Sequence, residues 1–135
     1  MTESRPVPWD AEFWLNTAAG VLSIQHCRDC RRLQHYPRPA CSTCLSTDLK
    51  FVPVSGRGSV YSFTVVRQPA DPAFAGEVPY ALVDVLLEEG PRLLSRIDGG
   101  ADGLQIGDAV TVTFVRRDGR ALPYFSRTEL TPRRP

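Results

Sequence analysis

Two close pairs of cysteines constrain the fold of this chain more than any other feature of its sequence. They follow the spacing C-x2-C-x10-C-x2-C, at Cys27, Cys30, Cys41 and Cys44. Two such pairs, each on a tight turn, present four thiolates in the tetrahedral arrangement that Zn(II) takes in closed structural sites. Because protein ligands fill all four positions, no water is activated there. We therefore expect one zinc ion that holds the fold rather than performing chemistry.

Other uses of four cysteines are disfavoured or stay open. The N-terminus carries acidic residues and lacks the apolar core of a secretory signal, which disfavours two disulfides. Neither pair lies in a βαβ pattern, which disfavours a thioredoxin-like redox pair. Iron takes the same four ligands, so the spacing alone leaves an iron site open. His26 and His35 lie near the cysteines, but four thiolates already satisfy the metal, and we expect both to be surface or outer-sphere residues.

The cysteine-bearing segment, residues 22–50, has few apolar side chains and no apolar periodicity. It cannot bury enough surface to order itself, so we expect a zinc ribbon in which the metal contributes on the order of 10 kcal/mol or more, as in zinc-finger peptides. Arg31 and Leu45 follow the second cysteine of each pair, where glycine is common because the turn favours positive φ. Neither residue forbids the site.

Residues 9–20 predict a short helix, with Asp10 as a plausible N-cap and Gly20 as a C-cap candidate. About ten residues is too short for a helix to be stable alone, so this one must dock on something. Three aromatic side chains are available for docking: Trp9, Phe13 and Trp14. The chain's own core and a partner subunit are both open as the receiving surface. We expect residues 1–21 to form a helical segment whose aromatic side chains dock on a partner.

From residue 52 onward apolar side chains alternate with polar ones, which is the pattern of β-strands. We expect five strands, at residues 59–67, 80–87, 92–97, 109–116 and 122–127. Residues 88–91 and 117–120 carry the glycine signals of hairpin turns. Five short strands with a small insertion between the third and fourth suit a Greek-key barrel of the OB type over residues 51–135, with an open β-sandwich as the alternative. The chain is thus expected to be mainly β.

Composition limits the compartment and the partners. A chain of 135 residues, 42% of them hydrophobic, forms one core or two small ones. No apolar run approaches the roughly 18 residues that span a bilayer, so we expect a soluble cytoplasmic protein with no membrane partner. The formal net charge of +1 attracts polyanions only weakly, which makes nucleic acid an unlikely partner.

A search for catalytic motifs finds no G-x-S-x-G, no H-E-x-x-H and no phosphate-binding glycine loop. The nearest to a glycine loop is Ser55-Gly-Arg-Gly58, which precedes a strand rather than a helix. It therefore lacks the helix N-terminus that grips phosphate, and we expect a β-turn or bulge there. No set of residues assembles an active site, so we do not expect catalysis by this chain alone.

Several motifs in fixed order resemble one known family: Gln25-His-Cys27-x-x-Cys30, Tyr36-Pro-Arg-Pro-x-Cys41, Ser55-Gly-Arg-Gly58, Val78-Pro-Tyr80 and Ile106-Gly-Asp-x-Val110. The family is that of the zinc-ribbon and OB-fold acyl-CoA-associated proteins, catalogued as a domain of unknown function. The resemblance implies an N-terminal helical segment, a rubredoxin-like zinc ribbon and a C-terminal OB fold. It also implies a small subunit bound to thiolase-like enzymes or acyl-CoA hydratases in lipid, steroid or polyketide metabolism. This sequence lacks the glycine that many members carry after the second cysteine.

The resemblance implies that some members help to hold coenzyme A, but it fixes no ligand-contacting residues. Phosphates and an adenine require guanidinium groups, backbone amides and a flat apolar surface. Arg38 lies between two prolines on the ribbon, and Arg57 lies in the glycine turn. These two arginines are the candidates for contact with an acyl-CoA ligand, and an ordinary solvated arginine is the alternative for each.

The functional hypothesis is a non-catalytic accessory subunit, in a hetero-oligomer with a thiolase, an aldolase or an acyltransferase, that helps to position an acyl-CoA substrate. The rival hypothesis is a nucleic-acid-binding module, because zinc ribbons and OB folds are both common in such modules. A single-strand binder needs a basic groove with exposed aromatic side chains. The barrel strands and turns instead carry acids among their arginines: Asp84, Glu88, Glu89, Asp98 and Asp108.

Overall fold

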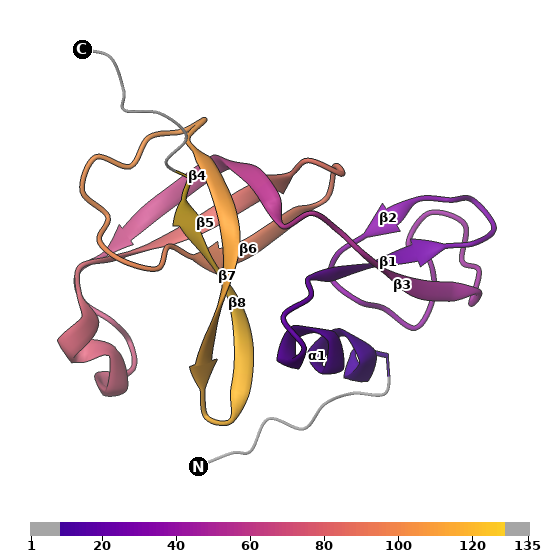
Figure 1. The fold of residues 1–135 in the computed structure, drawn as a ribbon, viewed down its shortest axis with the longest axis horizontal. Coiled ribbons are helices and arrows are strands. Elements are labelled where there is room, and N and C mark those ends of the chain that lie inside the picture. Colours follow the sequence, from indigo (N-terminus) through magenta and orange to yellow (C-terminus); the bar gives the residue numbers. More distant parts are fainter. Residues whose placement is uncertain (1–8, 129–135) are drawn as a thin grey trace.

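The computed structural model describes residues 9–128, which form one short helix, a 3-10 helix and eight strands (Figure 1). In chain order these are α1 (Ala11–Ala18), β1 (Ser23–Cys27), β2 (Leu33–Gln34), β3 (Leu49–Pro53), β4 (Arg57–Val66), η1 (Pro72–Glu77), β5 (Tyr80–Leu87), β6 (Arg92–Arg96), β7 (Ala109–Arg117) and β8 (Arg120–Arg127). The strands form a three-stranded sheet in the order β2-β1-β3 and a five-stranded sheet in the order β6-β5-β4-β7-β8. The fold is mainly β, as expected.

The five strands of the larger sheet confirm the five predicted strands, and their bounds agree with the predicted ones to within two residues at each end. Strand β5 shows the reason, since every second side chain is buried: Ala81, Val83, Val85 and Leu87. A register shift between Val60 and Ser62 bends β4, and such a bulge increases strand twist. A parallel bridge between Ile97 and Phe125 brings the two ends of the sheet together. The result is one nearly closed barrel sheet, as in an OB fold, and not a sandwich.

The three strands of the ribbon sheet were not predicted, because they lack period-two alternation. Four of the five side chains of β1 are buried, and two of these, Ser23 and Gln25, are polar. The sequence of this strand therefore shows neither an apolar alternation nor a continuous apolar run. Strand β1 pairs with β3 from Ser23↔Pro53 to Cys27↔Leu49, and with β2 through Gln25 and His26. One element between barrel strands was not predicted, the 3-10 helix η1. Residues 99–107 form turns, in agreement with the expected small insertion between the third and fourth strands.

Helix α1, the ribbon and the barrel share one hydrophobic core. Phe13 of α1, Leu22 and Ile24 belong to the same buried cluster as the inward side chains of the barrel strands. The hairpin of β7 and β8 points toward α1 (Figure 1), and the guanidinium of Arg120 lies 4.5 Å from the ring centre of Trp14. The short helix is therefore stabilised by its own chain. Among the described residues, no helix is long and apolar enough to span a membrane.

The ends of α1 differ in how well the expected caps are realised. Asp10 occupies the N-cap position but accepts no backbone N–H with its side chain. Its Oδ2 instead accepts a hydrogen bond from the indole N–H of Trp14, at 3.4 Å. At the other end Gly20 has φ +79°, a left-handed conformation that glycine adopts without strain and that commonly terminates helices.

Candidate metal centre and apolar groove

The structure brings the four predicted cysteines together. Cys27 ends β1, Cys30 follows on the adjoining turn, and Cys41 and Cys44 lie on the second turn. The Sγ atoms of Cys27 and Cys44 are 3.5 Å apart, those of Cys30 and Cys41 are 3.6 Å apart, and all four lie within 4.8 Å of one another. Zinc–sulfur bonds of about 2.3 Å in a tetrahedron place sulfur atoms about 3.8 Å apart. The donor set therefore fits a single zinc ion, and no disulfide joins the four thiols.

The two cysteine turns have the same backbone geometry. The N–H of Arg31 donates to the carbonyl of Cys27 at 2.8 Å, and the N–H of Leu45 donates to the carbonyl of Cys41 at 2.9 Å. Arg31 has φ 67° and Leu45 has φ 66°, so both turns take the left-handed conformation that the spacing predicts. The chain thus accepts a modest local strain at two non-glycine residues to aim both cysteine pairs at one point.

Backbone N–H groups favour the thiolate form at two of the four cysteines, whereas burial and the neighbouring cysteines raise the pKa values of Cys30 and Cys44. N–H groups of Cys44 and Thr43 lower the pKa of Cys41 to about 6. The N–H of Cys30 lies 3.5 Å from the Sγ of Cys27 and lowers the pKa of that thiol. Thiolates stabilised in this way are good zinc ligands. A bound zinc ion would link the two turns across the ribbon and leave no coordination position open to substrate.

A groove of about 620 Å³ lies between α1, the loop after β2, η1 and strands β5, β6 and β8. Six aromatic side chains contribute to its wall: Phe13, Trp14, Tyr36, Phe74, Tyr80 and Tyr124. This groove was not predicted, because its wall combines residues from six elements that are distant in the sequence. A volume of this size is typical of small-molecule sites.

One residue of the groove wall belongs to a cluster of two arginines and one acid. Arg96 lines the groove, and its guanidinium lies 2.8 Å from Glu77, which also pairs with Arg117. Hydrogen bonds from Arg117 and then from Arg96 lower the pKa of Glu77 despite its partial desolvation. Arg96 also lies 4.0 Å from the ring centre of Tyr80. Two guanidinium groups sharing one carboxylate give this cluster a net positive charge.

Two residues that line the groove carry a buried polar atom without a hydrogen-bond partner among the described residues: Asp10 Oδ1 and His35 Nδ1. Burial lowers the pKa of His35 to about 4, so its imidazole is neutral at pH 7. His35 was expected to be a surface or outer-sphere residue; it is instead half-buried beside Phe13, at 5.6 Å between ring centres. Unpaired buried polar atoms are costly, and each calls for an explanation.

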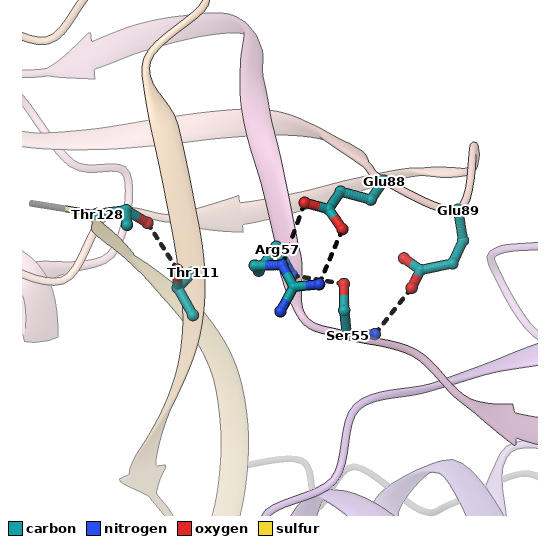
Figure 2. A network of polar contacts seen from close by, with 6 residues as sticks. All are labelled: Ser55, Arg57, Glu88, Glu89, Thr111 and Thr128. Carbon is teal, nitrogen blue, oxygen red and sulfur yellow. Dashed lines mark hydrogen bonds and ion pairs between the residues drawn. The ribbon is translucent and has the colours of Figure 1, made fainter. Parts of the chain in front are cut away.

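The two arginines named as candidates for coenzyme A contact lie outside the groove lining. Arg57 pairs with Glu88 through its Nε and Nη2, at 3.1 and 3.2 Å, and Glu89 accepts a hydrogen bond from the nearby N–H of Ser55 at 2.9 Å (Figure 2). The Glu88 carboxylate raises the pKa of Arg57 above its ordinary value. This region thus has one guanidinium and two carboxylates, and its net charge is negative. Arg38 is exposed on the ribbon.

The aromatic side chains expected to dock on a partner have different surroundings. Phe13 is only 4% exposed and packs in the chain's own core. Trp14 is half-buried, with its ring edge-on to Phe13 at 5.0 Å. Trp9 is 41% exposed. The expected docking role stays a prediction for all three residues, and Trp9 is the one with the most exposed side chain.

A cysteine ribbon followed by a small five-stranded barrel defines the class of zinc-ribbon and OB-fold proteins. Residues 17–50 match the ChsH2 rubredoxin-like zinc ribbon domain, and residues 51–115 match the ChsH2 C-terminal OB-fold domain. These two matches cover most of the chain. The chain therefore belongs to the ChsH2 family of DUF35 proteins.

Three curated relatives illustrate the range of this family. A probable enoyl-CoA hydratase alpha subunit from Thermomonospora curvata is 40% identical over 86% of this chain and 37% of that protein. A DUF35 domain-containing scaffold protein from Methanothermobacter thermautotrophicus is 36% identical over 73% of this chain and 76% of that protein. The benzoylsuccinyl-CoA thiolase subunit BbsA of Geobacter metallireducens is 28% identical over 78% of this chain and 70% of that protein. The chain thus spans about a third of the first relative and most of the other two.

Among solved structures, a chain of the Ltp2-ChsH2(DUF35) aldolase is similar to this one. It has a TM-score of 0.83 and 33% sequence identity, and the match covers 93% of this chain and 98% of that chain. The likeness therefore extends through the helix, the ribbon and the barrel together.

Proposed function

We propose that this chain is a non-catalytic subunit that binds a thiolase-superfamily enzyme, namely a thiolase, an aldolase or an acyltransferase, and helps to position its acyl-CoA substrate. The match to a whole chain of the Ltp2-ChsH2(DUF35) aldolase carries this proposal, because that chain has its counterpart here over almost its full length. The names of the relatives as a thiolase subunit, a hydratase subunit and a scaffold protein support a role in a hetero-oligomer.

The side chains of the groove support a non-catalytic role. Asp10, His35 and Ser95 all line it, and these are the residue types of a hydrolase triad. A triad requires hydrogen bonds from the nucleophile to the base and from the base to the acid. Here the hydroxyl of Ser95 donates to the carbonyl of Pro123, and His35 Nδ1 has no partner among the described residues. The three groups therefore do not form a relay.

The zinc ribbon serves this function as a rigid support. Cys27 and the other ligands hold the turns from which the loop containing His35 and Tyr36 extends to the groove wall. Preorganised walls lower the entropy cost of binding. In this proposal the metal determines the shape of the binding surface and takes no part in chemistry.

Affinity purification of the tagged chain from its native host, followed by mass spectrometry, tests the proposal. The expected result is co-purification of a thiolase-superfamily enzyme or an acyl-CoA hydratase at a fixed ratio to the chain. Recovery of the chain alone, or with nucleic acid and no such enzyme, would contradict the proposal. A Trp9→Ala variant tests the docking helix, since loss of an interface aromatic commonly weakens binding by about tenfold or more. Leu15→Ala, six residues further along the same segment and 71% exposed, is the matched control.

A further inference from the structure

We propose that residues 67–79, between β4 and β5, form a flap that opens and closes one side of the groove, and that the carboxylate of Glu77 is its latch. The latch is closed when Glu77 bridges two arginines of the barrel, Arg96 and Arg117. The inference concerns a movement within this chain, so it goes beyond the proposed function and does not depend on it.

The flap is attached to the barrel more loosely than the strands on either side of it. None of the six residues of η1 is buried, and η1 stands outside the strands of the barrel (Figure 1). Its N-terminus is capped from within the flap, because Asp71 accepts hydrogen bonds from the N–H groups of Ala73 and Phe74 at 2.9 and 3.0 Å. Among the described residues, the backbone of the flap is not hydrogen-bonded to a strand of either sheet. Segments with few buried contacts and only local hydrogen bonds are those that open at low free energy.

Phe74 and Glu77 attach the flap to the barrel through their side chains. Phe74 lines the groove, and its ring centre lies 6.2 Å from that of Tyr80 and 5.0 Å from the guanidinium carbon of Arg117. Glu77 binds Arg96 at 2.8 Å and also binds Arg117. The carboxylate is partly buried, so salt screens these ion pairs less than it screens a fully exposed pair. Closure of the flap thus depends on one ring and one carboxylate.

The two arginines of the latch are held by the barrel itself. Arg96 lies on β6, with its guanidinium 4.0 Å from the ring centre of Tyr80. Arg117 ends β7, and its Nε donates a hydrogen bond to the hydroxyl of Tyr124 at 2.8 Å. Both guanidinium groups therefore stay in place when the carboxylate of Glu77 leaves.

Opening of the flap changes both the width and the charge of the groove. Phe74 and Glu77 lie on the same side of η1, because side chains three positions apart are eclipsed in a 3-10 helix. They therefore leave the barrel together. Arg96 lines the groove, and in the open state it faces the groove without its carboxylate. Two guanidinium groups that no longer share an anion repel each other, so the closed flap is the resting state.

A permanently closed segment is the alternative. In that case the segment separates from the barrel only when the whole chain unfolds. The two cases differ in whether Phe74 becomes accessible before the core does. Chymotrypsin distinguishes them, because its hydrophobic specificity pocket must receive the ring of Phe74 before the bond after this residue is cleaved. Cleavage at this bond therefore reports that the ring has left the groove.

Limited proteolysis of the purified, zinc-loaded chain by chymotrypsin, followed by mass spectrometry, tests the inference. When opening and closing are fast relative to cleavage, the cleavage rate follows the open population. Glu77→Gln keeps the size of the side chain but removes its charge, so cleavage after Phe74 should be faster than in the parent by about tenfold or more. Glu88→Gln is the matched control, because it removes a carboxylate that pairs with Arg57 on another part of the barrel. It should leave the rate unchanged.

Cleavage after Phe125 measures global unfolding in the same sample, since this ring is fully buried in the core. It should stay slow in every variant. Arg117→Met breaks the latch from the barrel side and should also accelerate cleavage after Phe74. The inference is overturned if the parent and Glu77→Gln are cleaved after Phe74 at the same rate, or if Arg117→Met has no effect. A parallel acceleration at Phe125 would also overturn it, because the flap would then open only with the whole fold.

Discussion

The side-chain amide of Gln25 forms hydrogen bonds with both the backbone N–H and the backbone carbonyl of Arg38. The N–H of Arg38 donates to Gln25 Oε1 at 2.9 Å, and Gln25 Nε2 donates to the carbonyl of Arg38 at 2.8 Å. Gln25 lies on β1 and is 3% exposed, and Gln34 donates a further hydrogen bond to Gln25 Oε1 at 2.6 Å. One buried amide thus fixes the loop after β2, whose His35 and Tyr36 form part of the groove wall.

Replacing Gln25 with leucine should destabilise the protein by about 1–3 kcal/mol. The backbone N–H and the backbone carbonyl of Arg38 would each lose a partly buried hydrogen bond. Urea denaturation measures this change. Gln105→Leu, at an exposed position, should change stability by less than about 0.5 kcal/mol. Equal stability of the Gln25→Leu variant and the parent would show that this bridge does not hold the loop.

Elemental analysis of the protein purified without added metal should return close to one zinc per chain. The Cys41→Ser variant should lose the metal and a large part of its stability, because structural zinc contributes on the order of 10 kcal/mol in zinc-finger peptides. Leu22 and Ile24 share the barrel's core, so the loss should also affect packing beyond the ribbon. Iron in place of zinc, or a mass that shows two disulfides, would contradict this account of the cysteines.

Gly58 should not tolerate alanine. A Cβ at this position would lie 2.5 Å from the carbonyl oxygen of Leu86 and 2.8 Å from Val85 Cγ1, so β4 and β5 would have to move apart. We expect Gly58→Ala to cost about 1–3 kcal/mol, as overpacking does elsewhere. Gly100→Ala is the control, because a Cβ there meets nothing within 4 Å. If thermal unfolding finds the two variants alike, Gly58 is not required for the close packing of β4 against β5.

Acid should weaken the fold through His35. Its pKa is lowered to about 4 in the folded protein, from an ordinary value of 6.5, because burial disfavours the charged ring. Between pH 6.5 and pH 4 the unfolded chain therefore binds more protons at His35 than the folded chain does. The stability that the neutral, buried ring provides is complete above pH 6.5 and is lost as the pH falls toward 4. The loss is as much as about 3 kcal/mol, at 1.36 kcal/mol per pKa unit.

The His35→Phe variant separates this effect from acid release of zinc. It keeps a ring in the groove wall but cannot titrate, so its stability should fall less between pH 7 and pH 5 than that of the parent. Zinc content measured at both pH values serves as the control. The same pH dependence in both proteins would contradict the assigned role of His35.

The sequence was sufficient to predict the parts of this fold whose signals are local. The cysteine spacing from Cys27 to Cys44 indicates two local turns, and the alternation around Val83 and Val85 indicates a single strand. The burial of Phe13 could not be predicted, because it depends on how the ribbon and the barrel approach each other. Tyr36 and Tyr124 reach one groove only through the tertiary fold. Arg57 was a candidate for contact with an anion, but Glu88, thirty-one residues away in the sequence, binds its side chain.

The kcat/KM of the co-purified enzyme for its acyl-CoA substrate, measured with and without this chain, tests the central claim most directly. A subunit that positions substrate lowers the barrier by binding and orientation. The account predicts that kcat/KM falls by about tenfold or more when the chain is removed, and that adding back the zinc-loaded chain restores it. An enzyme with the same kcat/KM in both states would contradict the account.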